Sequence, residues 1–192
     1  MKKILSLVLV LALAMSLAAC GKKAETTETT GVPAQEMPAS ALEVLETIWA
    51  DYAEDEKFAV IGGSMAAPVD GAPGSYDIAD ENITYNLLIP AEQLANVTEA
   101  ASMIHMMNAN TFTCGVFKLA DGVSAADFGA AMKEAVMNNR WMCGFPETLV
   151  IQNIADTYVL VAFGVNDALT PFEKHMSNVY PGFETITNEP IA

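Results

Sequence analysis

Basic residues are scarce in this sequence of 192 residues, which has 9 Lys and Arg against 24 Asp and Glu. From Pro38 onward the only cations are Lys57, Lys118, Lys133, Lys174 and a single arginine, Arg140. Domains that bind nucleic acid need clustered Lys and Arg to neutralise phosphates, so we expect no nucleic-acid partner. Anionic lipid headgroups would also repel so acidic a surface.

Motifs that carry catalysis or metal binding are missing as well. The sequence has no HExxH zinc pair, no GxSxG nucleophile elbow, no CxxC redox pair and no Asp-rich calcium loop. Its two histidines, His105 and His175, are 70 residues apart. A reactive cysteine would need an electropositive pocket, which so few cations cannot supply. We therefore expect no catalytic residues, no cofactor and no enzyme.

The one long apolar run lies at the N-terminus. Ile4–Leu17 is apolar apart from two serines and follows Lys2 and Lys3. The run has about 14 residues, whereas a membrane-spanning helix needs roughly 20. A short basic start, an apolar run and small residues at its end are typical of a secretory signal peptide, which we predict for residues 1–19.

The end of this run, Leu17-Ala18-Ala19-Cys20, resembles the lipobox of bacterial lipoproteins. The resemblance implies cleavage before Cys20 and attachment of a diacylglyceryl group to it, and two acyl chains suffice for stable membrane anchoring. Cleavage there leaves seven Lys and Arg against 24 Asp and Glu, a formal charge of −17. Residues 20–37 are rich in Thr, Glu, Ala and Pro without apolar periodicity, which predicts a lipidated cysteine followed by a disordered linker.

Residues 38–192 are predicted to form one α+β domain. In its N-terminal part, Ser40 and Glu43 form a capping box that begins an amphipathic helix over 41–54. The weaker predictions that follow are a strand at 58–61, an irregular loop at 62–75, an ambiguous helix or strand at 80–89, and helices at 91–96 and 99–107.

The C-terminal part has a more regular pattern. Strand, helix, strand, strand, helix and strand follow one another, which predicts a ferredoxin-like βαββαβ sheet over about 111–188. The strands are expected at 111–119, 149–154, 157–163 and 183–187, with helices beginning after the caps Ser124 and Thr170. The strand at 157–163 is apolar almost throughout, which indicates burial on both faces. We therefore expect the N-terminal helices, 41–54 and 91–107, to cover the second face.

Three groups of residues are candidates for a site. The segment Met103, His105, Met106 and Met107 has thioether and imidazole groups that suit Cu(I), but the helical spacing of its methionines equally predicts core packing or a Met-lined peptide groove. Trp141 and Phe145, beside Arg140, are typical interface anchors or plugs at the end of a core. Cys114 and Cys143 predict either a disulfide, in a chain that leaves the cytoplasm, or two buried small residues.

Two stretches carry a further resemblance: His105–Thr113 (HMMNANTFT) and Trp141–Glu147 (WMCGFPE). Together with Tyr158-Val159 and Ala162-Phe163-Gly164, they resemble a family of small uncharacterised lipoproteins from anaerobic Gram-positive bacteria. The resemblance covers about 80–192 and implies location and fold, but it implies no activity.

These observations lead to one functional expectation and one alternative. We expect a lipid-anchored lipoprotein outside the cytoplasm, held at the cell membrane and acting as a non-enzymatic interaction or accessory module for another envelope protein. The alternative is a lipoprotein that binds a small ligand or Cu(I) through the Met/His cluster at 103–107.

Overall fold

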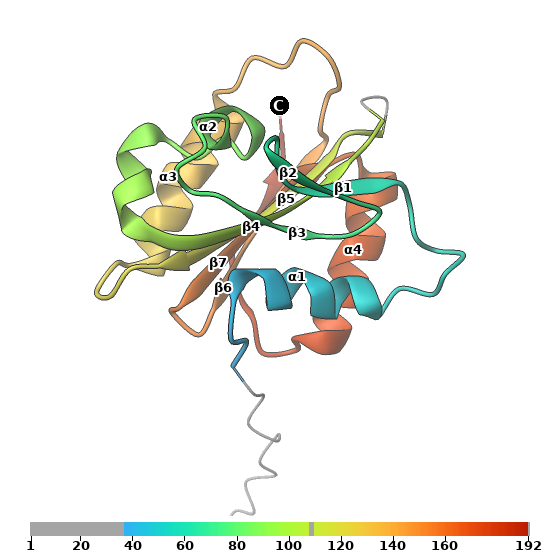
Figure 1. The fold of residues 1–192 in the computed structure, drawn as a ribbon, viewed down its shortest axis with the longest axis horizontal. Coiled ribbons are helices and arrows are strands. Elements are labelled where there is room, and N and C mark those ends of the chain that lie inside the picture. The colour runs from blue at the N-terminus through green and yellow to red at the C-terminus, as the bar shows by residue number, and fades with distance from the viewer. Residues whose placement is uncertain (1–36, 108–109, 192) are drawn as a thin grey trace, which may run out of the picture. The chain divides into compact units, whose positions relative to one another are not determined.

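A single antiparallel sheet organises residues 37–107 and 110–191, which the computed structural model describes (Figure 1). These described residues belong to one compact unit. The strand order is β2-β1-β4-β5-β7-β6-β8, and β3 also pairs with β4. The strands are β1 (Val60–Ser64), β2 (Ala67–Asp70), β3 (Gly74–Tyr76), β4 (Val97–His105), β5 (Phe112–Leu119), β6 (Thr148–Ile154), β7 (Tyr158–Gly164) and β8 (Glu184–Pro190). The fold class is therefore α+β, as predicted.

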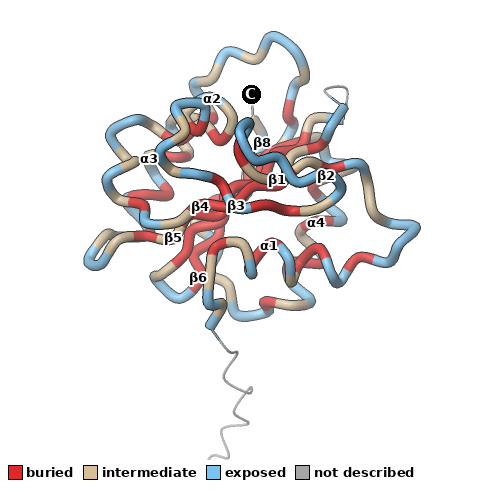
Figure 2. Tube along the Cα trace, viewed as in Figure 1, coloured by how far each residue is buried: buried red, intermediate tan, exposed pale blue. Residues whose placement is uncertain are grey.

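Helices cover both faces of this sheet. On one face, α1 (Ala41–Ala50) and α4 (Asn166–Val179) pack on apolar residues that include Met103, Cys114 and Leu160. On the other, α3 (Ala125–Met137) packs on Phe117, Val159 and their neighbours, with the segment around α2 (Ile83–Asn86) beside it. All seven residues of β7 are buried, so the predicted burial of this strand on both faces is confirmed (Figure 2).

The strand order differs from that of a ferredoxin-like sheet, in which the fourth strand of the βαββαβ unit lies beside the first. Here the fourth strand, β8, lies beside the second, β6. The β5-α3-β6 and β7-α4-β8 connections therefore step across the sheet in the same direction from antiparallel strands. Right-handed crossovers then place α3 and α4 on opposite faces, as observed, and the ferredoxin-like arrangement is not confirmed.

Of the two helices predicted at 91–96 and 99–107, the first is present as a 3-10 helix and the second is wrong. Ala91–Asn96 forms a 3-10 helix, and the chain then enters β4, which pairs with β5 from Val97 to Ile104. The Ala- and Met-rich composition favours a helix by intrinsic propensity, but pairing with strands on both sides overrides it. Among the N-terminal elements, α1 covers the second face together with α4. Residues 91–107, which were expected to cover it as well, do not.

The predicted loop over 62–75 is also wrong, because it holds most of β1, all of β2 and most of β3. β1 and β3 pair with successive parts of the same edge of β4, at residues 103–105 and 100–102. The glycines that suggested a loop instead allow two backbones to approach closely where β1 meets β3.

Two helix boundaries are informative. The capping box at α1 is confirmed, since Ser40 Oγ accepts the Glu43 N–H at 3.1 Å. By contrast, α4 begins at Asn166 rather than after Thr170, and Pro171 lies inside it. The Asn166 N–H donates to Glu147 Oε2 at 2.7 Å, so a residue 19 positions away caps this helix. The predicted cap at Thr170 is therefore wrong.

Candidate functional site

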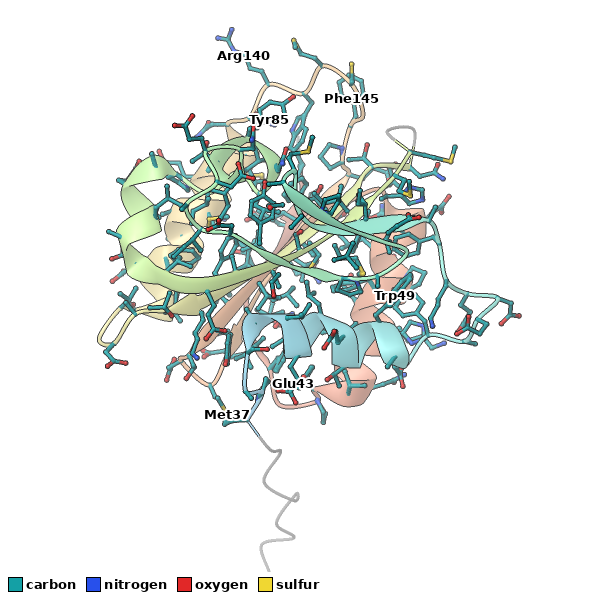
Figure 3. All side chains as sticks on the ribbon, in the orientation of Figure 1. Met37, Glu43, Trp49, Tyr85, Arg140 and Phe145 are labelled. Atoms are coloured by element: carbon teal, nitrogen blue, oxygen red, sulfur yellow. The ribbon has the colours of Figure 1, made fainter. Side chains whose placement is uncertain are left out.

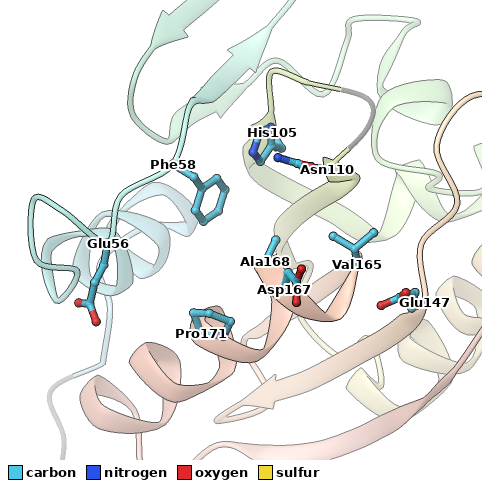
Figure 4. Close-up of a pocket in the computed structure, with 9 residues that line it drawn as sticks. All are labelled: Glu56, Phe58, His105, Asn110, Glu147, Val165, Asp167, Ala168 and Pro171. Atoms are coloured by element: carbon cyan, nitrogen blue, oxygen red, sulfur yellow. The ribbon is translucent and has the colours of Figure 1, made fainter.

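Two hollows open at the same end of the sheet, one on each face, and His105 at the end of β4 lines both. The first, the acidic cleft, has a volume of about 420 Å³ and lies on the α4 face (Figure 4). The second, the distal groove, has a volume of about 310 Å³ and lies on the α3 face.

His105 is a neutral hydrogen-bond donor in this position. Its Nδ1 accepts the Met107 N–H at 3.0 Å, so the ring proton resides on Nε2. Its ring stacks on Phe58 with centroids 5.2 Å apart, and burial lowers the pKa of its imidazole. The lone pair of Nδ1 accepts the Met107 amide, and Nε2 carries the proton. Neither nitrogen is therefore free to bind a metal or to accept a proton.

The Met/His cluster does not converge on a metal site. The segment is a strand, so Met103 and His105 point to the same face, where sequence spacing on a helix had placed them apart. Met103 is fully buried in the core, whereas Met106 and Met107 are exposed beyond the end of β4. Among the described residues, no group of three His, Cys, Asp or Glu could hold a metal ion either.

The carboxylates of the acidic cleft serve the fold around them. Glu147 caps α4, and Asp167 lies in its first turn, where the helix dipole favours negative charge. Glu56 Oε2 accepts the Ala53 N–H at 3.2 Å and lies 3.7 Å from His175 Nε2. These three carboxylates therefore have structural roles, which account for the acidic character of the cleft.

The second histidine joins α4 to the end of α1. His175 is buried, stacks on Tyr52 with centroids 3.8 Å apart, and places Nδ1 2.8 Å from Asp51 Oδ2. Asn178 donates to the same oxygen at 2.9 Å. The hydrogen bond from Asn178, followed by that from His175, lowers the pKa of Asp51 below its ordinary value of 3.8. His175 is thus a structural residue.

Replacing Asp51 by Asn is expected to lower stability at neutral pH and to matter less in acid. A carboxyl with a lowered folded-state pKa contributes stability above its unfolded pKa, near 3.8, and loses that contribution as pH falls through the folded value. Urea unfolding at pH 7 and in steps below pH 4 measures this, with Asp55→Asn in the same exposed loop as the control. An equal deficit for Asp51→Asn at every pH would contradict the expectation.

The floor of the distal groove is the last cross-strand row of the sheet on the α3 face. Ile104 pairs with Thr113 and Thr113 pairs with Phe163, so their side chains lie side by side. α3 ends at Met137, and the loop that follows places Trp141 on Phe163. Thr113 and Phe163 are buried, and Ile104 is partly exposed.

Two segments form the walls of the groove. Trp141 packs on Phe163 with ring centroids 5.5 Å apart, and Met142 follows it at the rim. Tyr85 and Leu88 stand on the other side, and Leu88 has a φ of 54°, a conformation that a leucine rarely adopts. Tyr85 and Met142 are 81% and 86% exposed, so the groove opens between large apolar side chains in contact with solvent.

The charge of the groove differs from that of the chain as a whole, which is acidic. Among the described residues, no Asp or Glu lines it, and Arg140 is the one Lys or Arg that does. Lys57, Lys118 and Lys133 form ion pairs with carboxylates, whereas Arg140 forms none with the described residues. The Trp141 Nε1–H is buried and has no acceptor among them. Arg140 is exposed and its side chain extends away from the domain, whereas the Trp141 Nε1–H is buried (Figure 3).

The two predicted interaction residues have different roles in the structure. Trp141 is half-buried and closes the end of the core by packing on Phe163, while Phe145 is 67% exposed. Figure 3 shows Phe145, Arg140 and Tyr85 at one end of the domain and Met37 at the opposite end. Their part in an interaction stays a prediction.

The two cysteines are free thiols and form no disulfide with each other. Cys114 points into the core between the sheet and α1, whereas Cys143 lines the distal groove on the other face. The alternative prediction of two buried residues holds for Cys114, and burial raises the pKa of its thiol. It fails for Cys143, which is exposed.

The predicted lipidation site, Cys20, lies outside the described residues, as do the predicted signal peptide and nearly all of the linker. Within 37–107 and 110–191, no helix has the length and apolarity needed to cross a bilayer. Comparison of the chain with protein families, curated proteins and solved structures finds no match.

Sequence reasoning missed half of the groove. Tyr85, Asn86 and Leu88 belong to a segment that was ambiguous between helix and strand, and nothing local marks them as neighbours of Trp141. One signal was present: the only arginine of the chain precedes a Trp-Met-Cys sequence.

Proposed function

We propose that this chain is a lipid-anchored lipoprotein on the outer face of the cytoplasmic membrane, whose folded domain binds another envelope protein and catalyses no reaction. One observation carries the binding part: exposed apolar side chains surround the distal groove, at the end of the domain opposite Met37 (Figure 3). The lipobox resemblance supports the anchor.

The position of the groove suits an anchored binding module. Met37 lies at one end of the domain, and Tyr85, Arg140 and Phe145 lie at the opposite end, so a tether that joins the domain at Met37 is attached away from the groove (Figure 3). Exposed apolar patches rimmed by polar residues mark interaction sites in soluble domains. Tyr85 and Met142 at the rim, with Arg140 beside them, belong to the residue types found at the centre of interfaces.

A small ligand, the alternative function, would use the same groove, because it is concave and combines exposed apolar side chains with polar ones. Copper receives no support from the geometry, since His105 has both nitrogens engaged and the methionines point apart. A non-enzymatic role is consistent with a histidine that can neither bind a metal nor accept a proton.

Photo-crosslinking in intact cells tests this proposal. A photoreactive amino acid in place of Met142 is expected to trap one discrete partner in the membrane fraction. The matched control is Met65, 72% exposed in the β1–β2 turn and away from the groove. Equal patterns of adducts from both positions, or none from Met142, would oppose a binding role for the groove.

A further inference from the structure

We propose that Met107 and Met142, which line the distal groove, are sites of reversible oxidation to methionine sulfoxide, and that this modification releases the bound partner. The inference rests on the proposed function and adds the regulation of the same site. It follows from three features: which apolar side chains are exposed, where these two methionines lie, and what oxygen transfer does to a thioether.

Methionine supplies most of the large exposed apolar side chains in the part of the chain that the structure describes. Eight such side chains are exposed there, and five of them are methionines: Met37, Met65, Met106, Met107 and Met142. No leucine or isoleucine is among the eight. Methionine is flexible and adapts to irregular surfaces, and a reversible reaction changes its polarity. Apolar contact at this surface therefore depends on a side chain that oxidants can alter.

The two methionines come from separate segments and line the same hollow. Met142 lies in the loop after α3 and is 86% exposed, while Met107 follows β4 and is 56% exposed. The Met107 backbone N–H donates to His105 Nδ1 at 3.0 Å, which holds this residue at the end of the strand. Both thioethers are thus open to a small oxidant in the folded domain.

The buried methionines provide the contrast. Met103 and Met132 are fully buried, and Met176 is 3% exposed. Susceptibility to oxidation follows exposure, so these three thioethers react only when the domain opens. The methionines of the groove react in the native state.

Hydrogen peroxide carries out this modification by transferring one oxygen atom to the thioether. The O–O bond of the peroxide breaks, an S=O bond forms and water is released, so the sulfur loses two electrons and the peroxide gains them. The product is a polar side chain whose oxygen accepts hydrogen bonds. Methionine sulfoxide reductases reverse the step, with two thiols becoming a disulfide and the oxygen leaving as water.

A sulfoxide on this surface opposes a partner that covers it. Covering an apolar thioether is favourable, whereas a covered sulfoxide oxygen needs a hydrogen-bond donor. Losing apolar contact and covering an unpaired oxygen at two positions is expected to weaken binding about tenfold or more. A bound partner would in turn shield both sulfur atoms from peroxide.

Peptide mass spectrometry of the full chain in phosphatidylcholine nanodiscs measures the modification without any partner. During timed exposure to hydrogen peroxide, Met107 and Met142 are expected to gain oxygen about tenfold faster than Met103 and Met132. Met65, which is 72% exposed outside the groove, should react at a rate similar to theirs. Rates at the groove as slow as those of the buried methionines would overturn the inference, because the two side chains would then be covered.

The crosslink from a photoreactive group at Phe145 measures release of the partner in membranes prepared from the cells. The yield after peroxide, relative to the same chain before peroxide, is expected to fall about tenfold. Methionine sulfoxide reductases with dithiothreitol should restore the yield. Dithiothreitol alone should not, because it reverses thiol oxidation at the exposed Cys143 but does not reduce a sulfoxide at an appreciable rate.

Substitution separates oxidation of this chain from oxidation of the partner. In a chain that carries both Met107→Leu and Met142→Leu, the yields before and after peroxide should be equal, because leucine has a similar volume and no thioether. Met65→Leu is the matched control, since it removes an exposed methionine outside the groove. Peroxide should still lower the yield of that control.

The outcomes distinguish this inference from the proposed function. A fall in yield that persists in the double variant would place the sensitive group elsewhere and overturn the inference. Restoration by dithiothreitol alone would also overturn it, because the effect would then belong to a thiol. An undiminished yield with both groove methionines oxidised would reject the release step but leave the groove as a binding surface. Absence of any adduct before peroxide would reject the proposed function itself, and the release step with it.

Discussion

Replacing Gly62 by alanine is expected to destabilise the domain by about 3 kcal/mol or more, at the upper end of the cost of overpacking. A Cβ on Gly62 would overlap the Gly74 nitrogen and the Pro73 carbonyl carbon and lie 2.6 Å from the Ala72 carbonyl oxygen. All three are main-chain atoms, so no side-chain rotation relieves the clash. The backbone of β3 must move away from β1, although β4 holds both strands.

Chemical denaturation and the melting temperature measure the effect. For a domain of this size, each kcal/mol shifts the melting temperature by roughly 2–4 °C, so a fall of about 10 °C is expected. Gly182→Ala is the matched control, because nothing lies within 4 Å of a Cβ placed there. A Gly62→Ala domain as stable as the Gly182→Ala domain would show that β1 and β3 do not cross as closely as described.

The same crossing explains a failure of sequence interpretation. Four glycines and two prolines over 62–75 indicate a loop by local rules, yet three strands begin or continue there. Gly62 and Gly74 have no side chain because another backbone occupies that space. Local composition cannot distinguish a glycine needed for a turn from one needed for a close approach.

A second failure accounts for the difference in sheet topology. Residues 99–107 have the composition of a helix, but 99–105 belong to β4, which occupies the edge of β5 where a ferredoxin-like sheet would place its last strand. That last strand, β8, lies instead beside β6. One wrong element assignment thus changes the expected neighbours of two strands and the face on which α4 lies.

The elements that were predicted well depend on local signals. β5, β7 and α3 have strong apolar periodicity or continuous apolar runs, and the caps Ser40 and Ser124 each accept an N–H three residues later. The start of α4 failed because its cap, Glu147, comes from the residue before β6. Contacts between distant segments are what single-sequence patterns do not contain.

The distal groove also depends on contacts between segments that are distant in the sequence. Its floor comes from β4, β5 and β7, and its walls come from the segment after α2 and the loop after α3. The sequence pointed to Trp141 and Phe145 as aromatic residues beside Arg140, and it also pointed to His105. It could not reveal that His105 lies between two hollows of opposite character, because the sheet register determines that position.

Replacing Met142 by aspartate is expected to lower partner binding at the groove at least tenfold without loss of stability. Met142 is 86% exposed, and substitutions at such positions usually change stability by less than about 0.5 kcal/mol. In the complex its side chain would be covered. A carboxylate there is either buried without a partner, which is costly, or pairs with Arg140 and competes with the ligand.

The yield of a crosslink from a photoreactive group at Phe145 measures this effect, since that residue is 67% exposed and follows Met142 in the same loop. Met65→Asp introduces the same charge at a methionine that is 72% exposed outside the groove, and its yield should match that of the unmodified domain. Equal losses from both aspartates would mean that added negative charge, wherever it lies, repels the partner. A loss confined to Met142→Asp, with both variants equally stable, is the result that a binding groove requires.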